Sequence, residues 1–118
     1  MSLDVTVYYR DELTGDRKDV WLEYSVFGWE STRKTFWGAA ILRQLGLKLL
    51  PELGNGAWLN IEGPELDQLE QEAHIILDNL ELIAQRTQYE HTWMFGEYMR
   101  NLLNAIAKAR EINGGVSI

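Results

Sequence analysis

Apolar and polar residues alternate with a period of two in two stretches near the N-terminus, residues 3–10 and 19–27. In the first stretch, one face of an extended chain carries the apolar side chains, namely Leu3, Val5, Val7 and Tyr9. Such alternation predicts half-buried strands, and Thr14-Gly15-Asp16 between the stretches is a turn signal. The pattern therefore predicts an antiparallel β-hairpin. Because both strand faces carry aromatic residues, we expect the sheet to be covered on both sides in places.

The spacing of apolar residues changes to a helical period after Gly28. Residues 32–45 predict a helix, with Ser31 or Thr32 as its N-terminal cap and Gly46 just beyond its end. Pro51 and the turn sequence Gly54-Asn55-Gly56 interrupt the pattern. Residues 57–61 then predict a short strand, which would help because two strands alone make a marginal sheet.

Two longer amphipathic helices are predicted over residues 64–86 and 89–112. Pro64 suits the first helical position, and Gly114-Gly115 ends the last helix. Since neither glycine nor proline marks a break near residues 86–88, one long bent helix is the alternative. The order of elements predicts an α+β fold in a single domain, residues 1–118, with the two C-terminal helices packed on the sheet.

Composition narrows the classes of function. The chain has no cysteine, which excludes disulfides, thiolate metal sites and a cysteine nucleophile. No apolar run is long enough to span a bilayer, and the N-terminus lacks the basic region and apolar core of a signal peptide. We therefore expect a cytoplasmic protein that does not bind membranes.

The net charge of −7 is concentrated in one block. Residues 49–85 contain eight acids and no lysine or arginine; the acids are Glu52, Glu62, Glu65, Asp67, Glu70, Glu72, Asp78 and Glu81. Phosphate backbones would be repelled, so nucleic-acid binding is disfavoured. An acidic helix face that includes Glu65, Glu72 and Glu81 would instead attract a basic protein partner. The alternative is an ordinary solvated helix face.

One row of side chains in this block has the spacing of metal ligands. Glu70, His74 and Asp78 are four residues apart and would share one helix face. Carboxylate and imidazole groups in such a row can bind a divalent cation, but no further ligand is identifiable in another element. The alternative is ordinary surface contacts along the helix, and we expect neither a metal nor a cofactor.

The last helix carries the only set of residues that resembles a catalytic cluster. His91 and Glu90 lie near its start, Glu97 and Arg100 follow, and Tyr98 and Asn101 lie close by. A histidine oriented by a carboxylate and facing a pocket could act as a general acid or base. The alternative is the solvated polar face of a helix, and the common nucleophile and nucleotide-binding motifs are absent.

Five tryptophans in 118 residues are an unusual number. Large aromatic side chains dominate both protein cores and interaction hot spots. We expect most of the five to lie in the core. Trp29, in the turn Gly28-Trp29-Glu30, is the one expected to be exposed and to contact a partner.

These features favour a non-catalytic protein–protein interaction module, such as an inhibitor, an immunity-like antagonist or an adaptor, with a basic partner. One alternative is a homodimeric structural or regulatory protein. It rests on the short sheet and on the last helix, where Phe95, Met99 and Leu103 widen the apolar surface that needs cover. Another alternative is a small-ligand binder or enzyme that uses the polar face of the same helix.

Overall fold

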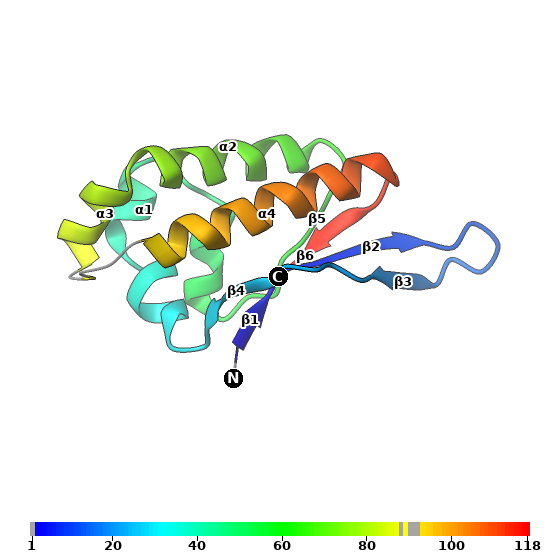
Figure 1. Ribbon diagram of the computed structural model, residues 1–118, viewed down its shortest axis with the longest axis horizontal. Helices are drawn as coiled ribbons and strands as arrows, with labels where there is room; N and C mark the ends of the chain where they lie inside the picture. The colour runs from blue at the N-terminus through cyan, green and yellow to red at the C-terminus, as the bar shows by residue number, and fades with distance from the viewer. Residues whose placement is uncertain (1, 88, 90–92) are drawn as a thin grey trace.

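A layer of helices packs on one face of a small antiparallel sheet, as the computed structural model shows (Figure 1). The structure describes residues 2–87, 89 and 93–118. The strands are β1 (Ser2–Asp4), β2 (Thr6–Arg10), β3 (Arg17–Val20), β4 (Val26–Trp29), β5 (Asn60–Glu62) and β6 (Gly115–Ser117). The helices are the π-helical turn η1 (Arg33–Trp37), α1 (Ala40–Gln44), the 3-10 helix η2 (Leu50–Asn55), α2 (Glu65–Asp78), α3 (Leu80–Thr87) and α4 (Trp93–Glu111). The predicted α+β class is confirmed.

The N-terminal hairpin is confirmed, but each predicted strand is divided in two. β2 pairs with β3, with Val7 opposite Val20, and β1 pairs with β4, with Leu3 opposite Gly28. Between these pairs residues 21–25 leave the sheet, and the Val5 amide donates to the Ser25 carbonyl at 2.8 Å. These five residues form an irregular segment, and the register of β1 and β4 also shifts between Leu3 and Asp4, as at a bulge. Alternation along the sequence continues through it, so the pattern alone could not locate the break.

The C-terminus supplies a strand that the sequence pattern did not predict. β6 lies between β2 and β5 in a sheet of order β3-β2-β6-β5. Its three residues are too few to show an alternating pattern. The predicted strand at 57–61 is displaced to Asn60–Glu62, because Ile61 pairs with Val116 of β6.

The predicted helix at 32–45 is interrupted at Gly38, whose amide donates to the Arg33 carbonyl at 2.8 Å and closes the π-helical turn η1. The helix resumes as α1 at Ala40. The predicted helix at 64–86 is likewise interrupted, at Asn79, whose side chain donates to the Ile75 carbonyl at 2.7 Å. Side-chain bonds to the backbone compete with helix continuation, which accounts for the break between α2 and α3.

The predicted last helix is present as α4, and α2 lies beside it in the opposite direction (Figure 1). The alternative of one long bent helix is therefore wrong. α4 buries one side against the sheet and another against α2, and its buried apolar residues include Phe95, Met99, Leu102, Ile106 and Ala109. At its first turn, Phe95 stacks on Phe36 of η1 with ring centroids 3.6 Å apart. No helix within the described residues is long and apolar enough to cross a membrane.

The burial of Tyr98 on α4 should make the folding stability fall at high pH. Burial raises the pKa of its phenol above the usual value of 10.0. Its neutral form is therefore favoured in the folded state, and this contribution to stability is complete below the unfolded pKa and lost as the pH rises through the folded pKa. We expect Tyr98→Phe to lose less stability than the wild type between about pH 9 and pH 11 in urea unfolding. An equal loss in both proteins would contradict this assignment.

Candidate functional site

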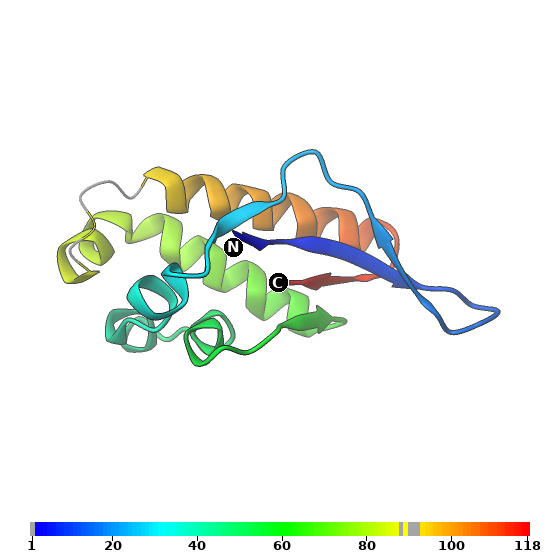
Figure 2. The same ribbon diagram turned by 90° about the horizontal axis from the view of Figure 1, so that it is seen from below.

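The sheet has one open face, which is turned toward the viewer in Figure 2, with α2 and α4 behind it. The central row of the sheet contains Val7, Val116 and Ile61, which are buried against the helices. Because successive residues of a strand point to opposite faces, the two neighbouring rows point outward. One is Thr6, Ser117 and Asn60, and the other is Asp19, Tyr8, Gly115 and Glu62.

The Tyr8 side chain covers the centre of this outward face. Its ring lies over Gly115, where a Cβ atom would come within 2.6 Å of the Tyr8 ring and hydroxyl. The Arg17 guanidinium lies 4.2 Å above the ring and donates to the Asn60 side chain at 2.9 Å. Burial and the Glu62 carboxylate raise the pKa of Tyr8, whose hydroxyl donates to Glu62 at 3.2 Å. This part of the face is therefore a closed polar network. The expectation of cover on both sides of the sheet is met here by side chains.

Four of the five tryptophans, all of which lie in the described ranges, are exposed. Trp21 is 83% exposed, Trp58 74%, Trp93 65% and Trp29 61%, whereas Trp37 is fully buried. The expectation that most tryptophans lie in the core is wrong. The period-two pattern could have indicated that two of them are exposed. Trp21 shares its face with Glu23 and Ser25, and Trp58 shares its face with Asn60 and Glu62.

Trp21 and Trp58 each line a hollow on the open face. The hollow at Trp21 has a volume of about 230 Å³ and is otherwise lined by Val5, Thr6, Val20, Leu22 and Ser25. The hollow at Trp58 has a volume of about 260 Å³ and is also lined by Thr6. The two hollows are therefore neighbours, separated by the Thr6 side of β2. Trp29 lines neither of them, so its predicted contact with a partner stays a separate prediction.

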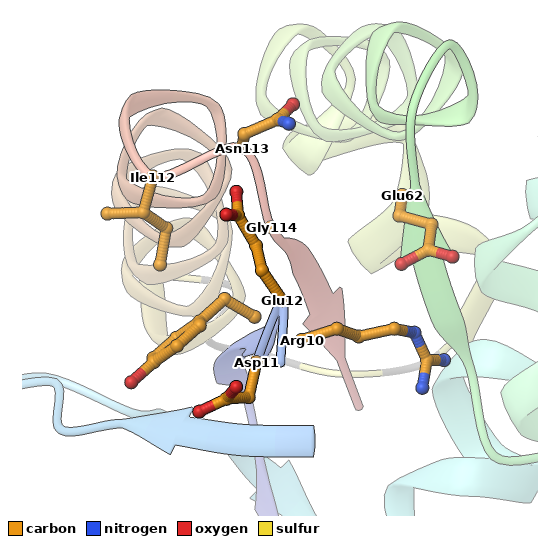
Figure 3. A pocket seen from close by; sticks show the side chains of 8 residues that line it. Arg10, Asp11, Glu12, Glu62, Ile112, Asn113 and Gly114 are labelled. Carbon is orange, nitrogen blue, oxygen red and sulfur yellow. The ribbon is translucent and has the colours of Figure 1, made fainter. Parts of the chain in front are cut away.

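A third hollow lies between the β2–β3 hairpin and the end of α4 (Figure 3), with a volume of about 520 Å³. In Figure 3 the Arg10 guanidinium extends to the side where the Glu62 carboxylate lies, and Glu12 points toward Asn113. The Asp11 carboxylate accepts hydrogen bonds from the amides of Leu13 and Thr14, so it forms the hairpin turn. This hollow combines charges of both signs and lacks histidine, serine and threonine among its lining residues.

Glu72 is not part of an exposed acidic face, so its predicted role in contacting a partner is wrong. Its side chain is fully buried and accepts hydrogen bonds from the amides of Lys48, Leu49 and Leu50 at 2.9–3.1 Å. The Gln68 side chain adds another at 2.7 Å. These amides include backbone donors at the start of η2 that have no acceptor within that helix. The Glu72 carboxylate of α2 accepts their hydrogen bonds, as the side chain of a local N-cap residue otherwise would.

Other acids of the 49–85 block are paired within the chain. Arg110 of α4 binds both Asp67 and Glu70 of α2, and the hydrogen bond to Glu70, followed by that to Asp67, raises the pKa of Arg110. Glu52 lies 3.7 Å from Arg43, and Glu62 accepts from Tyr8. Among the residues that the structure describes, Glu65, Asp78 and Glu81 are the members of the block without such a partner. The acidic helix face is therefore smaller than its sequence indicates.

The metal-ligand row is divided by the same ion pairs. Glu70 is committed to Arg110, whereas His74 and Asp78 are exposed on α2. Within the described ranges, no three histidine, aspartate or glutamate side chains lie close enough together to hold a metal ion.

Only some members of the candidate catalytic cluster lie within the described residues. His91 and Glu90 lie outside the described residues. Glu97 and Arg100 form an exposed ion pair one helical turn apart. Asn101 donates to the Val26 carbonyl at 2.8 Å and so attaches α4 to β4, and Tyr98 is buried beside Phe27 and Phe95. Asn101 and Tyr98 thus have structural roles, whereas Glu97 and Arg100 lie exposed on α4.

One ground for the homodimer, the wide apolar surface of α4, is not met, because Phe95 and Met99 are buried within the chain and Leu103 is half-buried. The sheet and α2 supply the cover that a second copy would have provided. The homodimer itself stays a prediction.

Exposed aromatic rings, carboxylates and hollows therefore coincide on the open face of the sheet, around Trp21, Thr6 and Trp58. The chain was compared with protein-family models, with curated proteins and with solved structures, and no match was found in any of the three.

Proposed function

We propose that this protein is a non-catalytic protein–protein interaction module that contacts its partner through the open face of the sheet. The observation that carries the proposal is the exposure of Trp21 and Trp58, 83% and 74%, beside two adjoining hollows. Exposed tryptophans are costly to leave in water, and tryptophan is among the residues most enriched in binding hot spots. A surface that gathers them beside concave sites has the composition of an interface core.

The contacts of Arg33 next to Trp58 favour a contact surface that is ordered before the partner binds. Arg33 is held by Glu30 at 2.7 Å and by the carbonyls of Leu53 and Ala57 at 3.3 and 3.1 Å. Its guanidinium lies 5.7 Å from the centre of the Trp58 ring. η2 and the segment that follows it are thereby tied to η1, and the residue just before Trp58 is held in place. A side chain ordered in advance loses less entropy on binding.

The partner's contact surface is expected to be basic. Asp4 and Glu30 line the hollow at Trp58, and Asp19 and Glu62 lie in an outward row of the same sheet. Together with the net charge of −7, these carboxylates favour approach by a positive surface. Asp19 and Glu30 are paired with Arg17 and Arg33, and Glu62 accepts from Tyr8, so the attraction comes from the excess negative charge of the chain and not from unpaired carboxylates. An inhibitor, an immunity-like antagonist or an adaptor would each fit this mode of binding.

Site-specific photocrosslinking tests the proposal. A photoreactive amino acid is placed at Trp21, Trp58 or Trp93 of the full chain in its native cells, and Trp93 serves as the control because it is also exposed, at 65%, but begins α4 in the helix layer. We expect a discrete protein adduct from positions 21 and 58 and none from position 93. Adducts from position 93 alone, or none from any position while the folded protein is abundant, would overturn the proposal.

A further inference from the structure

The hollow at Trp58 has a chemical character that its neighbour lacks. Its lining includes the acidic residues Asp4 and Glu30 and no lysine or arginine, and Arg33 pairs with Glu30 beside it. Leu3 and Ile118 add apolar surface, and Thr6 and Ser117 add hydroxyl groups. The neighbouring hollow at Trp21 is lined by no charged residue. The two hollows therefore suit different side chains of a binding partner.

We propose that the hollow at Trp58 binds an arginine side chain from a basic, extended segment of the protein partner. This inference rests on the proposed function and specifies the chemistry of its contact. A guanidinium group stacks on an aromatic face and donates several hydrogen bonds in its own plane, so it can use Trp58 and the carboxylates together. Tryptophan is the most favourable aromatic residue for such a cation.

The chain already contains an arrangement of this kind. Arg33 lies 5.7 Å from the Trp58 ring while its Nε donates to Glu30 at 2.7 Å. The Arg33 side chain is only 10% exposed, whereas Glu30 remains 38% exposed beside it. Part of the Glu30 side chain thus remains accessible, Glu30 is among the residues that line the hollow, and Trp58 is mostly in solvent. A second guanidinium from a partner would meet the same two groups from outside.

The position of Thr6 favours an extended segment over a free small cation. Thr6 lines both hollows, so one strand-like segment can reach across it and place one side chain in each. The uncharged hollow at Trp21 suits an apolar side chain, and the hollow at Trp58 suits the arginine. A metal ion is not favoured as the occupant, because no three acidic or histidine side chains gather within the described ranges.

Selection from a displayed library of random nine-residue peptides tests the inference with the purified full chain. Peptides are selected on the wild type, and binding is then measured by fluorescence anisotropy for the wild type, Trp58→Ala, Thr6→Lys and the control Trp93→Ala. We expect selected peptides to share an arginine next to an apolar position. Replacing that arginine by citrulline, which keeps the shape and removes the charge, should weaken binding about tenfold. Trp58→Ala and Thr6→Lys should have similar effects, and Trp93→Ala none.

The outcomes separate this inference from the proposed function. Selected peptides that tolerate citrulline but lose affinity in Trp58→Ala would overturn the arginine and leave the interaction surface standing. Equal binding of lysine and arginine peptides would also overturn it, because a planar group would then be unnecessary. Peptides that bind Trp58→Ala as well as the wild type would overturn the assignment to this hollow. If crosslinking at positions 21 and 58 finds a partner but no library peptide binds, the extended segment is wrong and the proposed function remains.

Discussion

Replacing Glu72 with alanine should lower the free energy of unfolding by about 3 kcal/mol or more. The reason is that Glu72→Ala removes the acceptor of three backbone amides, those of Lys48, Leu49 and Leu50, in a fully buried position. Buried donors without an acceptor cost more than an average hydrogen bond contributes, because they were desolvated on folding and gain nothing in return. Urea unfolding followed by circular dichroism measures the difference.

Glu65→Ala is the matched control for this prediction. It removes the same kind of side chain from the first turn of the same helix, but Glu65 is exposed, so the change should stay within about 0.5 kcal/mol. Glu72→Gln should fall between the two, since a single amide oxygen still accepts hydrogen bonds but without the charge. Equal stabilities of Glu72→Ala and Glu65→Ala would show that Glu72 does not hold η2 to α2.

Gly54→Ala should cost about 3 kcal/mol for a different reason, a collision between two backbones. A Cβ atom at Gly54 would lie 2.4 Å from the Gly38 Cα and 2.6 Å from the Gly38 nitrogen. Both atoms belong to the main chain, so no side-chain rotation can relieve the contact. η1 and η2 would have to separate, and with them the carbonyls of Leu53 and Ala57 would move away from Arg33. Thermal unfolding of the variant and the wild type measures the cost.

Gly56→Asn, two residues away, distinguishes close contact from backbone conformation. Gly56 has a φ of 81°, in the left-handed region, and no other atom lies within 4 Å of its Cβ position. Asparagine tolerates this conformation better than most residues, so the loss should be below about 1 kcal/mol. If Gly56→Asn were the more damaging change, the contact between η1 and η2 would not be the constraint on Gly54.

Both variants also bear on binding, because they disturb the segment that positions Trp58. Glu72 holds the start of η2, Gly54 sets its distance from η1, and Trp58 follows three residues after η2 ends. Loosening of η2 should therefore weaken binding at the open face even where the rest of the fold survives. The stability of this segment and the function proposed for its neighbour are thus linked by one set of contacts.

The candidate site was harder to predict than the fold. Trp58 and Trp21 were expected in the core because large aromatic side chains usually lie there. Their exposure follows from what does not cover them, since α2 and α4 both pack on the opposite face of the sheet. The acids of residues 49–85 were read as one exposed face, but Arg110 and the amides of η2 pair with several of them from distant parts of the chain.

The sequence by itself determined the local character of most segments: the N-terminal hairpin, the longer helical stretches and the α+β class, whereas the predicted break at Pro51 and Gly54 is the 3-10 helix η2. These follow from the period of apolar residues and from turn and cap residues, which act over a few positions. Only the tertiary structure decided where β6 pairs, where the hairpin and helices break, that Glu72 is buried, and that Trp21 and Trp58 are open. Those outcomes depend on which distant residues supply a hydrogen bond or cover a side chain. A periodic pattern along the chain describes one face of an element and does not record what packs against it.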